Sequence, residues 1–352
     1  MDLQQRINAF KILGEFLRQF VIEEPVKLRN AENNKLFLDG FRHQLKLAEE
    51  HNSWFTKNNL NFALKSWANA LTENNLNTWT SKYSFDDVNP KTIAIIMAGN
   101  IPLVGFHDFL SVLITGHSVL VKQSTNDKHL LPYLAKYLET IEPQFKGKIK
   151  FIEEKLEGFD AVIATGSNNT ARYFEYYFKD KPSIIRKNRN SVAVLSGKES
   201  HEQLEALSDD IFRYYGLGCR NVSKVFVPKD YAFDAFFKAI YKWHSIIHEN
   251  KYANNYDYNK AVYLMSEFKL LENGFLMLKE DESFSSPIAT VFYEHYNDSN
   301  SLKGYLESKK EDIQCIVAYG FTENEIAFGK TQEPQLWDYA DNVDTVEFLL
   351  KT

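Results

Sequence analysis

The sequence contains little cysteine, and no apolar run opens it. Only Cys219 and Cys315 occur, which is too few for a disulfide framework and is typical of a reducing compartment. Charged residues such as Asp2, Arg6 and Lys11 interrupt the N-terminal region, which excludes a secretion signal or a membrane span there. We therefore expect a cytoplasmic protein without a membrane span.

Basic residues are not in excess either. The chain has 47 acidic and 41 basic residues, and no segment gathers lysine and arginine as a protein that binds a phosphate backbone would. We expect no nucleic-acid partner. Hydrophobic residues make up 44% and charged residues 25% of the chain, the balance of a globular protein. A length of 352 residues favours two domains or one elaborated α/β unit.

Two hydrophobic patterns divide the chain. Residues 1–84 show helical spacing and few turn signals, which predicts a helical N-terminal segment. Short β-branched runs then alternate with helical segments, as in a crossover-connected parallel sheet. We predict an α/β fold with a dinucleotide-binding domain over 85–190, a C-terminal return over 316–352, and a catalytic domain over 191–315. Strands are predicted at 92–97, 118–121, 148–152, 160–164, 192–195, 223–227, 288–293 and 313–319. Helices are predicted at 102–115, 127–140 and 201–215, and a helix-rich stretch over 231–268.

A cysteine between two predicted elements is the first candidate for chemistry. Cys219 follows Gly216 and Gly218, which allow a tight turn and leave the next side chain at the end of an element. As a thiolate it would attack a carbonyl carbon or a thioester, with Arg220 or backbone N–H groups lowering its pKa. The alternative is a small buried side chain beside a turn. Cys315 lies in an apolar strand and is expected in the core.

Polar turns follow the first two strands of the predicted cofactor domain. Gly99 and Asn100 come after the strand at 92–97, where Gly99 allows close approach and Asn100 offers an amide donor at the carboxyl edge of the sheet. A helix cap is the simpler role for Asn100. Lys122 ends the next strand and would either reach a ribose or phosphate or remain solvated.

A third turn carries Thr165, Gly166 and Ser167 between a strand and a helix. Backbone N–H groups and hydroxyls at a helix N-terminus suit a pyrophosphate, although such turns are common. His244 and His248 are four residues apart but lack the glutamate of a metalloprotease and an obvious third ligand, so we expect no metal. The polar run 186–189 is expected to be a solvated turn.

Taken in order, these pieces resemble the aldehyde dehydrogenase superfamily, and most closely the long-chain acyl-CoA reductases of the LuxC family. The resemblance covers about residues 88–345. It implies a Rossmann-type cofactor domain and an α/β catalytic domain that carries a cysteine nucleophile. It rests on the order and spacing of the runs Ala98–Pro102, Val119–Lys122, Ala164–Ser167, Gly216–Cys219 and Val225–Pro228.

The resemblance also implies site roles. Cys219 is the nucleophile, and Asn100 with the backbone N–H of Cys219 forms an oxyanion hole. Lys122 lies near the adenosine ribose, and the turn 165–167 borders the pyrophosphate and the nicotinamide. Glu282 holds the nicotinamide ribose, although Ser286 stands where the family's motif has a glycine.

Two departures from the family pattern narrow the reaction. Hydrolytic members carry a glutamate that activates water, whereas the stretch 185–191 has no carboxylate here. An acyl-enzyme would then persist until a thiol or a hydride reached it. Relatives that prefer NAD often carry a glutamate at the position of Thr125, and its absence admits a 2′-phosphate. NADPH is therefore the expected cofactor, with NADH possible.

The sequence thus predicts NADPH-dependent reduction of a fatty acyl-coenzyme A thioester to the aldehyde through an acyl-cysteine intermediate. The alternatives are a cysteine acyltransferase or thioesterase that needs no nicotinamide, and a catalytically silent binding protein of the same fold. The expected partner is the small-molecule acyl-coenzyme A substrate. A homo-oligomer or an acyl-transferring partner enzyme is compatible with the sequence.

Overall fold

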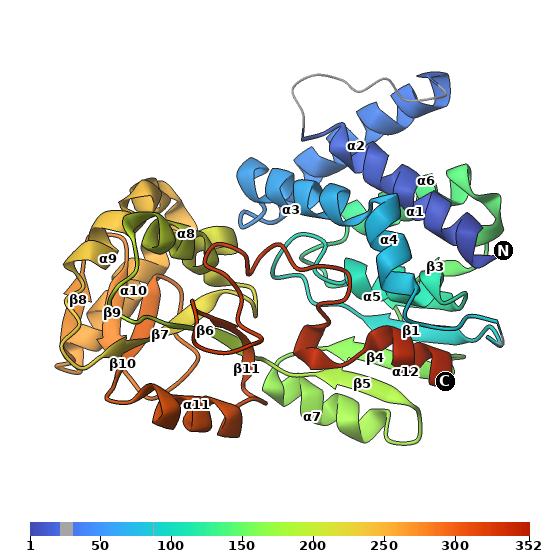
Figure 1. The fold of residues 1–352 in the computed structure, drawn as a ribbon. Coiled ribbons are helices and arrows are strands. Elements are labelled where there is room, and N and C mark those ends of the chain that lie inside the picture. Colours follow the sequence, from blue (N-terminus) through green and yellow to red (C-terminus); the bar gives the residue numbers. More distant parts are fainter. Residues whose placement is uncertain (22–30, 87) are drawn as a thin grey trace. The chain divides into compact units, whose positions relative to one another are not determined.

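The computed structural model describes residues 1–21, 31–86 and 88–352 (Figure 1). The chain forms two compact units. The first comprises Met1–Lys187 and Gln335–Thr352, and the second comprises Asn188–Pro334.

A five-stranded parallel sheet forms the centre of the first unit. Its strand order is β3-β2-β1-β4-β5. Because both neighbours of β1 run parallel to it, the segments after β2, β1 and β4 emerge at one carboxyl edge, which is the ligand-binding edge of such sheets. The strands are β1 (Thr92–Ile96), β2 (Ser118–Lys122), β3 (Ile149–Phe151), β4 (Ala161–Thr165) and β5 (Ser183–Arg186).

Helices cover both faces of this sheet, as its continuous apolar strands require. Ile93 and Ile95 belong to the large core shared with the N-terminal helices. Ala94 belongs to a smaller cluster on the other face, which includes Phe174 of α7 and Phe178, the residue that follows α7. In Figure 1, α7 lies on the opposite side of the sheet from α5 and α12. The helices are α1 (Leu3–Arg18), α2 (Ala31–His51), α3 (Lys57–Ala70), α4 (Glu73–Thr80), α5 (Phe106–Ile114), α6 (Leu130–Ile141), α7 (Asn168–Tyr177) and α12 (Thr345–Lys351).

The second unit has a six-stranded sheet of order β11-β6-β7-β10-β9-β8. All pairs are parallel except β8 with β9. The strands are β6 (Asn190–Val194), β7 (Val222–Pro228), β8 (Leu270–Glu272), β9 (Met277–Glu280), β10 (Thr290–Tyr296) and β11 (Ile313–Val317), and the α-helices are α8 (His201–Phe212), α9 (Asp234–Ala239), α10 (Asn250–Met265) and α11 (Ser299–Ser308).

The alternation of strands and helices confirms the predicted α/β class, and four helices precede β1. Part of the predicted helical segment, residues 22–30, lies outside the described residues. The stretch predicted as helix-rich at 231–268 contains α9, a 3-10 helix over Ile240–His248 and α10. The chain returns to the first unit at Gln335 rather than at 316, because β11 pairs with β6 in the second sheet.

The prediction of a solvated turn at 186–189 was wrong for its first residue, Arg186. Arg186 ends β5 and is buried, and its guanidinium forms an ion pair with Asp108 of α5 and donates to Thr345 Oγ1 at 3.1 Å. A buried guanidinium needs such partners because its charge is costly to desolvate. This pair therefore ties β5, α5 and the C-terminal helix α12 together.

A buried carboxylate organises the loop after β1. Asp127 accepts from the backbone N–H of Leu103 at 2.8 Å, and Leu103 has a φ of 57°, a region that a leucine rarely occupies. The Asp127 side chain is buried, and its second oxygen has no hydrogen-bond partner among the described residues. Burial raises the pKa of Asp127 to about 6, and the hydrogen bond from Leu103 opposes the rise. The helix predicted from residue 102 therefore begins only at Phe106.

The variant Asp127→Asn should remove a pH dependence of stability. Because the pKa of Asp127 rises from 3.8 to about 6 on folding, the folded state holds more proton than the unfolded state in this window. The free energy of unfolding then falls as pH rises, by on the order of 3 kcal/mol once pH exceeds 6. Urea unfolding between about pH 4.5 and 7 should show the variant gaining stability relative to the parent protein. A difference between the two proteins that stays constant with pH would contradict this.

Candidate active site

Cys219 lies in the turn that leads into β7, and its side chain is exposed. Three consecutive left-handed residues precede this turn: Tyr214, Tyr215 and Gly216, with φ angles of 54°, 59° and 76°. Left-handed tyrosines are strained, and such strain persists only where packing enforces it. Both tyrosine side chains are buried, which supplies that packing. The buried side chains of Tyr214 and Tyr215 therefore hold the unusual backbone conformation that precedes the Cys219 thiol.

Asn221 fastens the cysteine turn to the end of α8. Its side-chain N–H groups donate to the carbonyls of Asp210 and Arg213 at 2.9 and 2.8 Å, and its Oδ1 accepts from Gly218 N at 2.8 Å. The Asn221 side chain is buried, so these bonds replace water for groups that would otherwise lack partners. The Asn221 amide thus supplies hydrogen-bond partners to carbonyls at the end of α8 and to the N–H of Gly218 in the turn that carries Cys219.

A second contact fixes the cysteine from the neighbouring strand. The hydroxyl of Ser191 on β6 donates to the carbonyl of Cys219 at 3.0 Å. Because β6 pairs with β7, this bond ties the carbonyl of the cysteine to the sheet.

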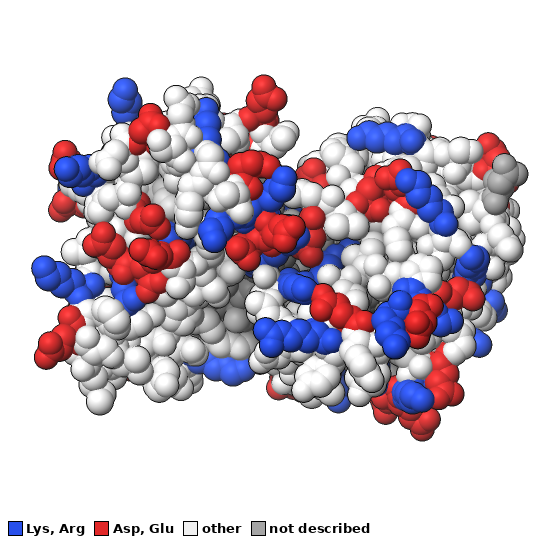
Figure 2. Space-filling view, turned by 90° about the horizontal axis from the view of Figure 1, so that it is seen from below, with Lys and Arg blue, Asp and Glu red and all other residues white. Residues whose placement is uncertain are grey.

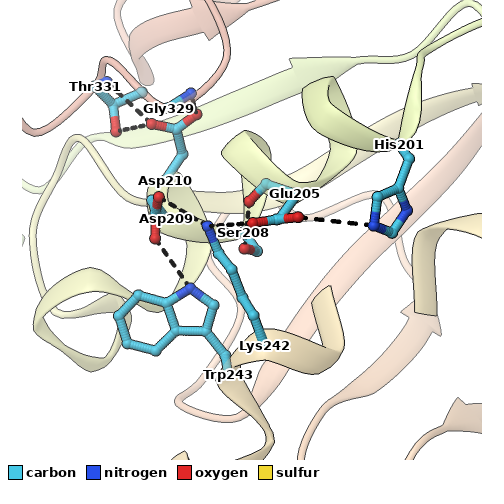
Figure 3. Close-up of polar contacts among 9 residues, drawn as sticks. All are labelled: His201, Glu205, Ser208, Asp209, Asp210, Lys242, Trp243, Gly329 and Thr331. Carbon is cyan, nitrogen blue, oxygen red and sulfur yellow. Dashed lines mark hydrogen bonds and ion pairs between the residues drawn. The ribbon is translucent and has the colours of Figure 1, made fainter. Parts of the chain in front are cut away.

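The end of α8 is itself held by two neighbouring carboxylates (Figure 3). Asp210 accepts from Gly329 N at 2.6 Å and from the backbone and hydroxyl of Thr331 at 3.0 and 2.8 Å. Asp209 points the other way and accepts from Lys242 Nζ and Trp243 Nε1, both at 3.0 Å. Burial raises the pKa of Asp210 to about 6, against the opposing effect of its hydrogen bonds.

Cys315 differs from Cys219 in exposure, as its sequence setting predicted. It is buried in β11, with 7% of its surface exposed. It nevertheless has a polar contact that the sequence did not reveal, because Arg220 Nη1 donates to its sulfur at 3.4 Å. Arg220, which the sequence suggested as a partner for Cys219, thus donates to Cys315.

The predicted residues of the first unit share one edge of its sheet. Ile96 is paired with Lys122 on one side and with Ala164 on the other, so Lys122, Asn100 and Thr165 follow or end three adjacent strands. The side-chain oxygen of Asn100 is buried, and Lys122 Nζ donates to the carbonyl of Glu154 at 2.8 Å.

Two glycines at this edge leave no room for a side chain. A Cβ at Gly99 would lie 2.6 Å from Ser124 Oγ, and one at Gly166 would lie 3.0 Å from carbons of Thr170 and Phe174. Ser167 caps α7 by accepting from Thr170 N at 3.3 Å. The edge therefore combines close-packed turns with a capped helix N-terminus, where backbone N–H groups favour anions.

Glu282 lies in the second unit, in the segment between β9 and β10, and its side chain is exposed. Its carbonyl accepts from Lys224 Nζ at 2.8 Å, and Ser223 Oγ donates to the carbonyl of Phe284 at 2.6 Å. Strand β7 thus holds both the cysteine turn at its start and the backbone around Glu282.

Lys224 is a buried cation beside the Glu282 backbone that the sequence reasoning missed. Its side chain is fully buried, forms an ion pair with Glu294 Oε2 at 2.7 Å, and lies about equally far from the rings of Phe226 and Phe284. A buried ammonium is costly unless it is paired and hydrogen-bonded. The sequence feature that could have indicated its burial is the position of this lysine within the apolar strand Val222–Pro228.

The described residues hold no group of three or more histidine, cysteine or acidic side chains arranged for a metal ion. His244 lies in the 3-10 helix before α10, with its Nδ1 3.0 Å from the carbonyl of Tyr241 and its ring stacked on the Tyr241 ring. No helix in the described ranges is long and apolar enough to cross a membrane.

Solved structures of aldehyde dehydrogenases share this fold. Aldehyde dehydrogenase 21 from Physcomitrella patens, solved with succinate, gives a TM-score of 0.67 at 11% identity, over 100% of this chain and 84% of the other. KauB from Pseudomonas aeruginosa gives 0.59 at 13% identity, over 90% and 75%. A variant of aldehyde dehydrogenase C from Pseudomonas syringae, with NAD+ and octanal, gives 0.58 at 11% identity, over 91% and 76%. The predicted aldehyde dehydrogenase-like fold is confirmed.

None of the curated proteins compared with the sequence matches it. The family model described as "Acyl-CoA reductase (LuxC)" matches residues 26–239, which is more than half of the chain and includes Asn100, Lys122 and Cys219. An oxidoreductase family acting on acyl-coenzyme A accords with the fold of the aldehyde dehydrogenases. The chain therefore belongs to the LuxC family of acyl-CoA reductases.

Proposed function

We propose that this protein reduces a fatty acyl-coenzyme A to the aldehyde with NADPH, through an acyl thioester on Cys219. The observation that carries the proposal is the exposed Cys219 thiol on a turn held by Asn221 and Ser191, in a chain of the LuxC family. A thiol that is exposed and held in place suits nucleophilic attack better than a packed one.

The chemistry needs two exchanges at sulfur. The thiolate of Cys219 attacks the acyl carbon, and coenzyme A leaves as a thiolate with the electron pair of the broken C–S bond. NADPH, when bound, supplies a hydride to the same carbon. The bond to Cys219 then breaks, its electron pair returns to sulfur, and the aldehyde leaves. By the family resemblance, Asn100 donates its amide N–H to the oxyanion that develops in both exchanges.

The carboxyl edge of the first unit fits a dinucleotide. The strand order β3-β2-β1-β4-β5 is that of a nucleotide-binding sheet, and the N-terminus of α7, capped by Ser167, follows directly after Thr165 and Gly166. Lys122 ends the strand next to β1 and is proposed for the adenosine ribose. Glu282 is proposed for the nicotinamide ribose, with Lys224 as the residue that positions its backbone.

The buried Arg186 sharpens the argument against hydrolysis. It lies in the stretch where hydrolytic relatives place a water-activating glutamate, and its charge is matched by Asp108. Because Asp108 is itself buried against the Arg186 guanidinium, it is not exposed to water as a general base for hydrolysis must be. The acyl-enzyme is therefore proposed to persist until reduction or transfer to a thiol.

The two cysteines should separate in function. Cys219→Ala should abolish both labelling by acyl-coenzyme A and aldehyde formation, because no other nucleophile replaces the thiol. Cys315→Ala is the matched control and should keep activity within about twofold, at a stability cost of about 1–3 kcal/mol for a small buried cavity. Intact-protein mass spectrometry and NADPH oxidation measure the two effects. Equal loss in both variants would refute the nucleophile, whereas coenzyme A release without any need for nicotinamide would favour an acyltransferase or thioesterase.

Cofactor choice should depend on residue 125. Thr125 is exposed just after β2, and its carbonyl lies 2.8 Å from His51 Nε2. Thr125→Glu would place a carboxylate against a 2′-phosphate and should lower kcat/KM for NADPH about tenfold relative to NADH, an energy of about 1.4 kcal/mol. Thr125→Gln is the control of equal size without the charge and should leave the ratio nearly unchanged. A parent protein that strongly prefers NADH would contradict the proposal.

Lys224 should affect nicotinamide binding more than acylation. Lys224→Met removes the donor to the Glu282 carbonyl, so the KM for NADPH should rise about tenfold while the burst of coenzyme A release stays within about twofold. The double variant Lys224→Met with Glu294→Gln removes the unpaired carboxylate and should recover stability without recovering KM. If the double variant restores the KM, Lys224 acts only through stability.

A further inference from the structure

A pocket of about 670 Å³ opens in the first unit at the edge of the sheet opposite to the one described above. Its walls come from the start of α1, the segment before β1, the turn Thr115–Gly116 before β2, and Lys148 before β3. These residues precede their strands, so the pocket lies at the amino edge. It is separate from the proposed dinucleotide edge of the same sheet.

Arg6 is the central polar group of this pocket. Its side chain is 7% exposed, and its Nε is buried without a hydrogen-bond partner among the described residues. No described acidic side chain forms an ion pair with its guanidinium, whose nearest aromatic neighbour is the Phe85 ring, 6.0 Å from Cζ. A buried charge without an ion-pair partner is unfavourable. Burial accordingly lowers the pKa of Arg6, and the negative charge of Asp2 opposes this fall without cancelling it.

The backbone is shaped to admit this guanidinium. Gly116 has a φ of 94°, and a Cβ there would lie 2.1 Å from Arg6 Nη1. Its carbonyl accepts from Lys148 Nζ at 3.1 Å, which brings a second cation to the same wall and leaves further N–H groups on the ammonium. Burial lowers the pKa of Lys148, and the nearby Arg6 lowers it further.

The carboxylates of the pocket wall already accept other hydrogen bonds. Asp2 Oδ1 accepts from Gln5 N at 2.8 Å as the cap of α1, and Asp86 Oδ2 accepts from Ser84 Oγ at 3.0 Å. Neither forms an ion pair with Arg6 or Lys148. On the face of the molecule that Figure 2 shows, basic and acidic side chains are interspersed.

We propose that this pocket binds a small organic oxyanion, a carboxylate or a phosphate monoester, on Arg6 and Lys148. The planar guanidinium matches two oxygens of either group, and the ammonium supplies a third donor. Tyr83, Phe85 and Val88 form an apolar wall for the rest of the ligand. The site lies outside the proposed acyl and nicotinamide chemistry and does not depend on it.

Isothermal calorimetry with phenyl phosphate and benzoate tests the proposal, because the two probes share a ring and differ in the oxyanion. We expect saturable 1:1 binding of at least one probe, and the tighter one identifies the class. Arg6→Met should weaken binding at least tenfold and Lys148→Met severalfold. Lys150 is an exposed lysine in β3, two residues further along the chain, so Lys150→Met is the matched control and should bind like the parent protein.

A second set of measurements keeps the test decisive if Arg6→Met fails to fold. Lys148 is only partly buried, so Lys148→Met tests the same site with less disturbance. Cys219→Ala should bind the probes unchanged, which separates this site from the proposed active site. No saturable binding of either probe overturns the proposal. So does binding that NADP+ displaces and that Lys148→Met leaves intact, since the anion would then occupy the dinucleotide edge.

Discussion

The buried amide of Asn221 joins the parts of the second unit that the proposed chemistry needs. A helix end leaves carbonyls without partners, and a tight turn leaves N–H groups without partners. Asn221 satisfies both kinds at once, because it donates to carbonyls at the end of α8 and accepts from Gly218. These bonds connect the end of α8 with the turn that carries Cys219, on either side of the left-handed residues Tyr214 and Tyr215.

Other loops of the protein are likewise held by hydrogen bonds from buried side chains to their backbone. Lys224 holds the carbonyl of Glu282, Asp127 holds the N–H of Leu103, and Asp210 holds the backbone of Gly329 and Thr331. Each is a buried charged side chain that bonds to loop backbone lacking a ladder partner. Such charges are costly to bury, so they specify one loop conformation at some expense of stability.

Charge placement also distinguishes the two edges of the first sheet. At the carboxyl edge, close-packed glycines and a capped helix favour a dinucleotide, and the cations there already contact backbone or carboxylate groups. At the amino edge, Arg6 lies buried beside Gly116, and no described acidic side chain forms an ion pair with it. The two edges of this sheet are thus proposed for different ligands, the carboxyl edge for the dinucleotide and the amino edge for a small anion.

Three features could be predicted from the sequence alone: the α/β class, the parallel sheet of the first unit, and the contrast between an exposed Cys219 and a buried Cys315. These depend on local features: apolar runs, glycine turns and the neighbours of each cysteine. Tertiary structure decided the burial of Arg186 and Lys224, the return of the chain at Gln335 and the contact of Arg220 with Cys315. These features depend on contacts between residues far apart in the sequence, such as Arg186 with Asp108 or Lys224 with Glu282. No local sequence pattern therefore predicts them. Whether a charged side chain is solvated or buried depends on partners that only the folded chain brings within reach.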